Sequence, residues 1–134
     1  RFMRYLLMVA SLLIMQSSYA DMMNYFSCRT TDNLAIKVDW LEKGDNWRLR
    51  YGPPNKIKNL ANNGTESSDS IRGYDNLEQR FLFQNGNYTY HIYIEWDRSD
   101  EVPEPMNAGL FKKQNGRVIE RKVCKPNTIF LGNG

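Results

Sequence analysis

The sequence predicts an all-β fold, a small antiparallel β-barrel or a compact sandwich of about seven or eight strands. Apolar and polar residues alternate along several short segments, as they do in strands that turn one face toward a core. Three internal Asn-Gly pairs are typical of tight hairpin turns. No segment after Ala20 shows the 3.6-residue periodicity of an amphipathic helix. These observations favour a single antiparallel β domain over residues 21–134.

The first 20 residues have the three parts of a secretory signal peptide. Arg1 and Arg4 make the start positive, residues 5–15 are almost uncharged and apolar, and small residues lie at the cleavage positions before and at Ala20. The alternative is a membrane anchor, but about 11 apolar residues are well short of the roughly 20 that a spanning helix needs. We therefore expect cleavage after Ala20, a periplasmic or secreted protein, and no stable membrane insertion of the mature chain.

The charge balance argues against nucleic acid as a partner. The chain has 18 Lys and Arg residues and 15 Asp and Glu residues, for a formal net charge of +3. Cleavage removes Arg1 and Arg4 and no acid, which lowers the net charge to +1. A nucleic-acid-binding protein needs a clustered basic face, and this balance does not indicate one.

Cys28 and Cys124 are the two cysteines of the chain, one near each end of the mature protein. In an oxidising compartment an even number of cysteines favours a disulfide. Closing a loop of this length restrains the unfolded chain by about 4–5 kcal/mol and would tie the first strand to the last. The alternative, a reactive or metal-binding thiol, needs a neighbouring His or a second close Cys, and neither cysteine has one.

Three strands are expected before residue 52, over the segments 24–31, 34–40 and 47–51. In the second and third segments apolar residues alternate with charged ones, so Asp39, Arg48 and Arg50 are expected on the solvent face. Gly44-Asp45 supplies the turn between these two strands.

Residues 52–73 are rich in Asn, Ser, Gly and Asp and contain few apolar residues, so we expect a loop with at most a short strand inside it. A connection of this length is uncommon and often functional, although a tolerated surface insertion is the alternative. Asn63 and Asn87 also match the N-glycosylation pattern, which matters only in a eukaryotic secretory pathway.

The segment 81–96 is expected to form the central hairpin. Its turn is placed at Asn85-Gly86 as a type I′ turn, which needs positive φ at both central residues. Thr89, His91 and Tyr93 share the face opposite the core and are the hairpin residues that a partner could contact. The expected core residues of the domain are Trp40, Trp47, Tyr51, Phe81, Phe83, Tyr90, Ile92 and Trp96.

The acidic, proline-stiffened segment 97–105 is expected to be a solvated loop, since a calcium site would need the EF-hand spacing that it lacks. A last hairpin follows over residues 110–124, with its turn at Asn115-Gly116. It gathers the basic residues Lys112, Lys113, Arg117, Arg121, Lys122 and Lys125.

This basic hairpin has two interpretations. Lysines on an exposed strand discourage aggregation between sheet edges, so the charges can simply be a solvated edge. The functional alternative is a docking surface for an acidic partner, with Lys112, Lys113 and Arg121 as the contacts.

Residues for catalysis are missing. His91 is the only histidine and has no partner at catalytic or metal-ligand spacing. Glu95 and Asp97 are the only local pair of carboxylates that could act together as in a glycosidase. We therefore expect no enzyme, no cofactor and no metal site, but a rigid scaffold that acts by contact.

A signal peptide, an N-terminal strand with a Cys, an alternating β body and a C-terminal Cys resemble the small periplasmic β-barrel proteins that include inhibitors of c-type lysozyme. Members of that family carry a Ser-Gly-x-x-Tyr loop that enters the lysozyme cleft. The nearest match here is Ser70-Ile71-Arg72-Gly73-Tyr74, which keeps the Ser and Tyr spacing but has its Gly at position 73. The resemblance implies a lysozyme partner, with Arg72 able to pair with a carboxylate of the cleft. The contacts it implies are Ser70, Arg72, Gly73 and Tyr74.

Two other functions stay open. A periplasmic immunity protein that neutralises a secreted toxin would also act by contact, and a toxin-like reading frame beside the gene would distinguish it. A carrier of a small apolar ligand would need space inside the barrel, and a filled aromatic core would exclude it.

Overall fold

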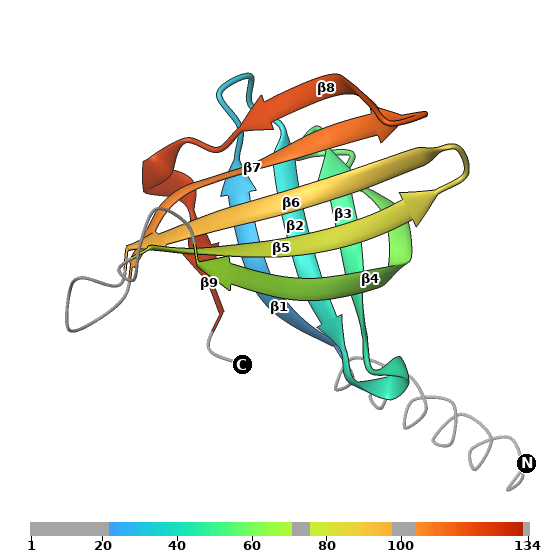
Figure 1. Cartoon of the computed structure of the whole chain (residues 1–134), viewed down its shortest axis with the longest axis horizontal. Helices are drawn as coiled ribbons and strands as arrows, with labels where there is room; N and C mark the ends of the chain where they lie inside the picture. Colours follow the sequence, from blue (N-terminus) through green and yellow to red (C-terminus); the bar gives the residue numbers. More distant parts are fainter. Residues whose placement is uncertain (1–21, 71–75, 98–103, 133–134) are drawn as a thin grey trace, which may run out of the picture.

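Nine antiparallel strands form one continuous sheet, which curls into a half-barrel (Figure 1). The structure is a computed structural model that describes residues 22–70, 76–97 and 104–132. Two 3₁₀ turns, η1 (Glu42–Gly44) and η2 (Pro126–Thr128), interrupt the strands. The strands are β1 (Met22–Arg29), β2 (Ala35–Leu41), β3 (Asn46–Gly52), β4 (Lys58–Ser70), β5 (Asn76–Asn85), β6 (Tyr88–Asp97), β7 (Glu104–Gln114), β8 (Arg117–Val123) and β9 (Phe130–Leu131).

The predicted antiparallel all-β fold is confirmed. The strand order is β8-β7-β6-β5-β4-β3-β2-β1-β9. Strands that are adjacent in the sheet are therefore consecutive along the chain, except for the β1–β9 pair. The count exceeds the expected seven or eight because β9 contributes two residues that pair with Phe26 and Ser27 of β1. In the part of the chain that is described, no helix is long and apolar enough to cross a membrane.

The core lies where strands β5 to β7 cross over β1 to β3 (Figure 1). Of the predicted core residues, Phe81, Phe83, Tyr90 and Ile92 are buried. The predicted residues Trp47, Tyr51 and Trp96 pack against that core while partly exposed. Trp40 is half-buried and lies outside the core cluster. The largest fully buried apolar side chains are Phe26, Ile36, Val38, Leu49, Phe81, Phe83, Ile92, Ile94 and Leu110.

The loop expected over residues 52–73 is wrong for most of its length, because β4 occupies residues 58–70. This strand pairs with β3 through its first half and with β5 through its second half. Many of its side chains are exposed, and among those of residues 58–68 only Leu60 and Ala61 belong to the apolar residues packed against the core. Its stability therefore comes from backbone hydrogen bonds to two neighbours, which the polar composition does not reveal.

Gly64 lies at the point where β4 changes partner, so Asn63-Gly64 is a strand corner and not a hairpin turn. Gly64 pairs with Trp47 of β3, and the next residue, Thr65, pairs with Leu82 of β5. A Cβ at position 64 would overlap the Phe83 ring and lie 2.8 Å from the Cβ of Trp47. A glycine here allows the close approach of two layers, which is a common role of glycine at sheet corners.

Gly64→Ala is expected to lower the free energy of unfolding by about 2–3 kcal/mol, because the added methyl group has no space between two large side chains. Denaturant titration would measure the loss. Gly44→Ala is the matched control, since its Cβ would meet only the flexible end of the Asn46 side chain, at 3.2 Å. Equal midpoints for the two variants would contradict this account of the corner.

Of the two remaining Asn-Gly pairs, Asn115-Gly116 forms a hairpin turn, and Asn85-Gly86 contributes only its glycine to one. Asn115 and Gly116 have φ of 52° and 77°, so the β7–β8 turn has positive φ at both central residues, as a type I′ turn requires. In the β5–β6 hairpin, Asn85 still pairs with Tyr88, which leaves Gly86-Asn87 as the loop. Only Gly86 has positive φ there, at 58°, so the expected turn at Asn85-Gly86 is wrong by one residue in position and is not of type I′.

The predicted disulfide between Cys28 and Cys124 is confirmed. Around it, Thr30 and Cys124 form an isolated antiparallel bridge, and the Lys125 N–H donates to the Arg29 carbonyl oxygen at 2.8 Å. The bond therefore joins β1 to the residue that follows β8, and draws the two ends of the long sheet together.

Candidate functional site

The outer face of strands β5 to β8 has an aromatic centre. Phe111 of β7 is only 9% exposed, and His91 of β6 stacks on it with ring centroids 4.5 Å apart and an interplanar angle of 8°. His91 and Phe111 are direct cross-strand partners, and Arg121 of β8 is the partner of Phe111 on its other side. Cross-strand neighbours on one face lie close enough for their side chains to interact.

Three cationic groups surround this ring. Lys113 Nζ lies 5.5 Å from the Phe111 ring centroid, and the guanidinium carbons of Arg121 and Arg80 lie 5.7 Å and 5.9 Å from it. Such distances allow cation–π attraction, which holds the charges against the ring. We call Arg80, His91, Phe111, Lys113 and Arg121 the basic aromatic patch.

The charges of the patch are only partly balanced. Arg80 Nε is 2.5 Å from Glu78 Oε1, whereas Lys113 and Arg121 form no ion pair within the described residues. Burial, followed by the positive charges of Lys113 and Arg80, lowers the pKa of His91 below its usual value of 6.5. His91 is therefore mainly neutral at pH 7, and the patch carries its positive charge on the two arginines and the lysine.

The structure brings some of the predicted binding residues together and separates others. Lys113 and Arg121 meet His91 in the patch, and Tyr93 lies beside them with its ring centroid 6.3 Å from that of Phe111. Lys112 points to the other face of the sheet, where Nζ lies 4.0 Å from the Tyr88 ring centroid. Consecutive strand residues face opposite sides, so Lys112 and Lys113 cannot contact the same partner surface.

The Ser-x-x-Gly-Tyr segment is mostly outside the described residues. Ser70 is the last residue of β4, and its backbone pairs with Leu77 of β5. Residues 71–75, which include Arg72, Gly73 and Tyr74, lie outside the described part of the chain. The predicted acidic loop likewise falls mainly on residues 98–103, which are not described.

Arg80 and Phe111 are site residues that the sequence does not single out. Arg80 lies on β5 and Phe111 on β7, and the apolar and polar residues around Phe111 do not alternate clearly. Their meeting depends on the register across β5, β6 and β7, which places Arg80 opposite Tyr93 and His91 opposite Phe111. No local pattern in the sequence predicts that register.

The prediction that Asp39 lies exposed on the solvent face of β2 is wrong. Its carboxylate is fully buried and accepts hydrogen bonds from Arg50 and Arg48. The Arg50 bonds are 2.7 and 3.0 Å long and the Arg48 bonds are 3.1 and 3.0 Å long. Asn24 Nδ2 donates a further bond of 3.1 Å. The two long side chains lie over the acid and remove it from water.

The pKa of Asp39 reflects two opposing effects. Burial alone would raise it, but the hydrogen bonds from Arg50, Asn24 and Arg48 outweigh burial and hold the pKa below its usual value of 3.8. A carboxylate that is ionised and fully hydrogen-bonded is unsuited to general acid or base work near neutral pH. We therefore assign Asp39 a structural role in joining β1, β2 and β3.

The described residues contain no group of three or more His, Cys, Asp or Glu side chains that could hold a metal ion. Comparisons with protein families, curated proteins and solved structures find no match to this chain.

Proposed function

We propose that this chain is a periplasmic or secreted binding protein that acts by contact and docks an acidic surface of a protein partner on the basic aromatic patch. The observation that carries the proposal is the arrangement of three cations around one aromatic ring on a single sheet face. Like charges held this close repel one another, and carboxylates of a partner would relieve that repulsion. Arginine and aromatic side chains are also enriched at the centres of protein interfaces.

Two protein partners fit this proposal. A c-type lysozyme is the partner that the resemblance implies, and carboxylates line its cleft. A secreted toxin is the alternative, and the chain would then be an immunity protein. Both predict that binding weakens as salt concentration rises, because exposed charge pairs are screened.

A ligand carrier with its ligand inside the barrel is less well supported. The core between the crossing layers contains Phe26, Phe81 and Phe83, all fully buried, together with aliphatic side chains, Tyr90 and the disulfide. A ligand there would have to displace packed core side chains.

The double variant Lys113→Glu with Arg121→Glu is expected to weaken partner binding at least about tenfold, because it replaces attraction with repulsion at the docking face. The partner would first be captured with wild-type protein from periplasmic and host fluids, and affinities then measured by surface plasmon resonance. Arg117→Glu is the matched control, since Arg117 is exposed on the same hairpin but does not touch Phe111. Equal affinities for wild-type protein and the double variant would remove the patch as the docking surface.

Lysozyme is tested separately. Purified protein in micromolar excess should slow the lysis of cell walls by a c-type lysozyme. Unchanged lysis would eliminate that partner, and the toxin alternative would then be examined through the reading frames beside the gene.

A further inference from the structure

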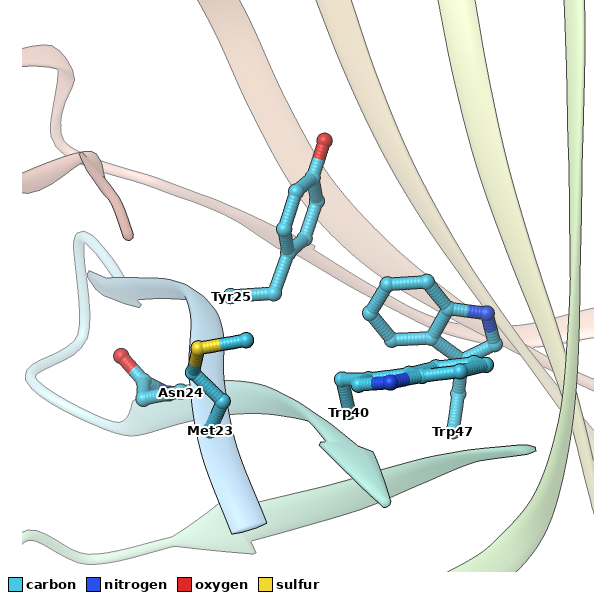
Figure 2. Close-up of a pocket in the computed structure, with 5 residues that line it drawn as sticks. All are labelled: Met23, Asn24, Tyr25, Trp40 and Trp47. Carbon is cyan, nitrogen blue, oxygen red and sulfur yellow. The ribbon is translucent and has the colours of Figure 1, made fainter. Parts of the chain in front are cut away.

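A second candidate site lies at the rim of the half-barrel, beside the start of β1 (Figure 2). It is a pocket of about 310 Å³ lined by Met23, Asn24, Tyr25, Trp40 and Trp47. Met23 and Tyr25 come from β1, and the two indoles come from β2 and β3. In Figure 2 the Met23 thioether and the Tyr25 ring lie on one side of the pocket, and Trp40 and Trp47 lie on the other. This volume is at the lower end of the range of small-molecule sites.

An irregularity in β1 directs Tyr25 into this pocket. Asn24 pairs with Asp39 and Phe26 pairs with Val38, which leaves Tyr25 as the extra residue of a β-bulge. A bulge changes the face to which a side chain points and is common beside functional sites. The Tyr25 hydroxyl donates to Gln79 Oε1 at 3.0 Å, and Trp96 Nε1 donates to the same oxygen at 3.3 Å. The bond to Gln79 therefore fixes the orientation of the Tyr25 ring at the wall of the pocket.

The opposite wall is also fixed by packing. Trp47 packs edge-on against Phe81 with ring centroids 4.8 Å apart, and against Tyr25 at 5.2 Å. Its strand partner is Gly64, whose missing side chain leaves room for this packing. Trp40 is the cross-strand partner of Trp47, with centroids 4.8 Å apart. Because Tyr25 and Trp47 each pack against Phe81 as well as against one another, these two walls are held in place and the pocket cannot readily collapse.

The lining selects the ligand chemistry. Aromatic faces and a thioether attract flat, polarisable molecules. None of the lining side chains is ionisable except the Tyr25 phenol, whose pKa is raised by burial. The Asn24 amide nitrogen is already bonded to Asp39 and to the Phe26 carbonyl oxygen. Behind β1, the two guanidiniums on Asp39 outnumber the single carboxylate, which disfavours a cationic ligand.

We propose that the rim pocket binds a small, uncharged aromatic molecule of one or two rings. The ligand would stack on the Trp40 and Trp47 indoles and contact the Met23 thioether at the mouth. This site is separate from the basic aromatic patch, since its residues come from β1, β2 and β3 and those of the patch from β5 to β8. It is independent of the proposed protein partner.

The test is a titration with p-cresol, followed by protein NMR. The indole Nε1–H signals of Trp40 and Trp47 should shift with saturation, and the backbone amides of Phe111 and Arg121 should not shift.

Trp40→Ala should weaken binding at least about tenfold, since it removes one face of the stack. Met23→Ala, at an exposed position, should weaken it several-fold without disturbing the fold. Leu82→Ala is the matched control, because Leu82 is an exposed apolar residue outside the pocket, and it should bind as wild-type protein does.

Benzylamine and benzoate, run in parallel, test the charge of the ligand. Weaker binding of both supports an uncharged aromatic ligand, and tighter binding of either overturns it. The proposal also fails if p-cresol gives no saturable shift up to about 10 mM, the range of very weak binding, or if Trp40→Ala and Met23→Ala both bind it like wild-type protein. The double variant Lys113→Glu with Arg121→Glu should bind p-cresol normally, so this result and the docking result can fail separately.

Discussion

Replacing Cys28 and Cys124 with alanine is expected to lower the free energy of unfolding by about 4–5 kcal/mol. The bond joins residues 96 apart in sequence, so it removes much of the freedom of the unfolded chain. Both residues are buried, at 5% and 3% exposure, and alanine introduces no buried polar group there. Denaturant titration of the double variant and of wild-type protein would measure the difference.

Reduction supplies the control for this prediction. Wild-type protein treated with a reducing agent should approach the stability of the double alanine variant, and the variant should not respond. A reducing agent that leaves the wild-type midpoint unchanged would contradict a stabilising role for the bond. After reduction, the backbone amides of β8 should exchange their hydrogens faster, and this increase should be larger in β8 than in β6. The reason is that β8 is an end strand, which the bond ties to β1.

Asp39→Asn is expected to cost about 3–5 kcal/mol of unfolding free energy, because it leaves two guanidiniums over a buried site without their counter-charge. Asp39 is fully buried, and the Arg48 and Arg50 side chains are only 18% and 22% exposed. Asp32→Asn is the matched control, since Asp32 also pairs with a cation, Lys122, but is about half exposed. We expect the control to cost less than about 1 kcal/mol.

Asp39 also makes the stability of the fold depend on pH. The folded pKa of Asp39 lies below its unfolded value of 3.8, so its contribution is complete above that value and is lost as pH falls through the folded pKa. The difference in stability between wild-type protein and Asp39→Asn should therefore be largest near pH 7 and shrink below pH 3.8. A constant difference between pH 7 and pH 2.5 would contradict an ionised, paired Asp39.

Much of the fold follows from local patterns. The alternation over residues 34–40 and 47–51 predicts two strands that the structure contains as β2 and β3. Asn115-Gly116 predicts a turn, because few other pairs tolerate two successive positive φ angles. The cysteines predict their bond because there are two of them and no competing partner. In each case the signal is carried by residues close in sequence or by simple counting.

Other features depend on what the rest of the chain places beside a segment. The polar stretch of β4 forms a strand because β3 supplies hydrogen-bond partners to its first half and β5 to its second half. Alternation correctly places Asp39 opposite the core, but not under two arginines that bury it. Alternation reports which face a side chain takes and does not report what covers that face.

The candidate sites show the same division. The basic character of the last hairpin is visible in the sequence, which groups Lys112, Lys113 and Arg121. The structure places Lys113 and Arg121 around one aromatic ring and Lys112 on the other face of the sheet. That ring, Phe111, and the third cation, Arg80, appear only when strand register is known. The rim pocket depends on a bulge at Tyr25 and a glycine at position 64.

The sequence by itself thus determined the antiparallel β class, two of the turns and the disulfide, because backbone conformation and residue alternation depend on near neighbours. Only the tertiary structure decided the strand corner at Gly64, the burial of Asp39, the basic aromatic patch and the rim pocket. The physical reason is that register and curl come from pairing between distant strands, and a shift of register brings different side chains together.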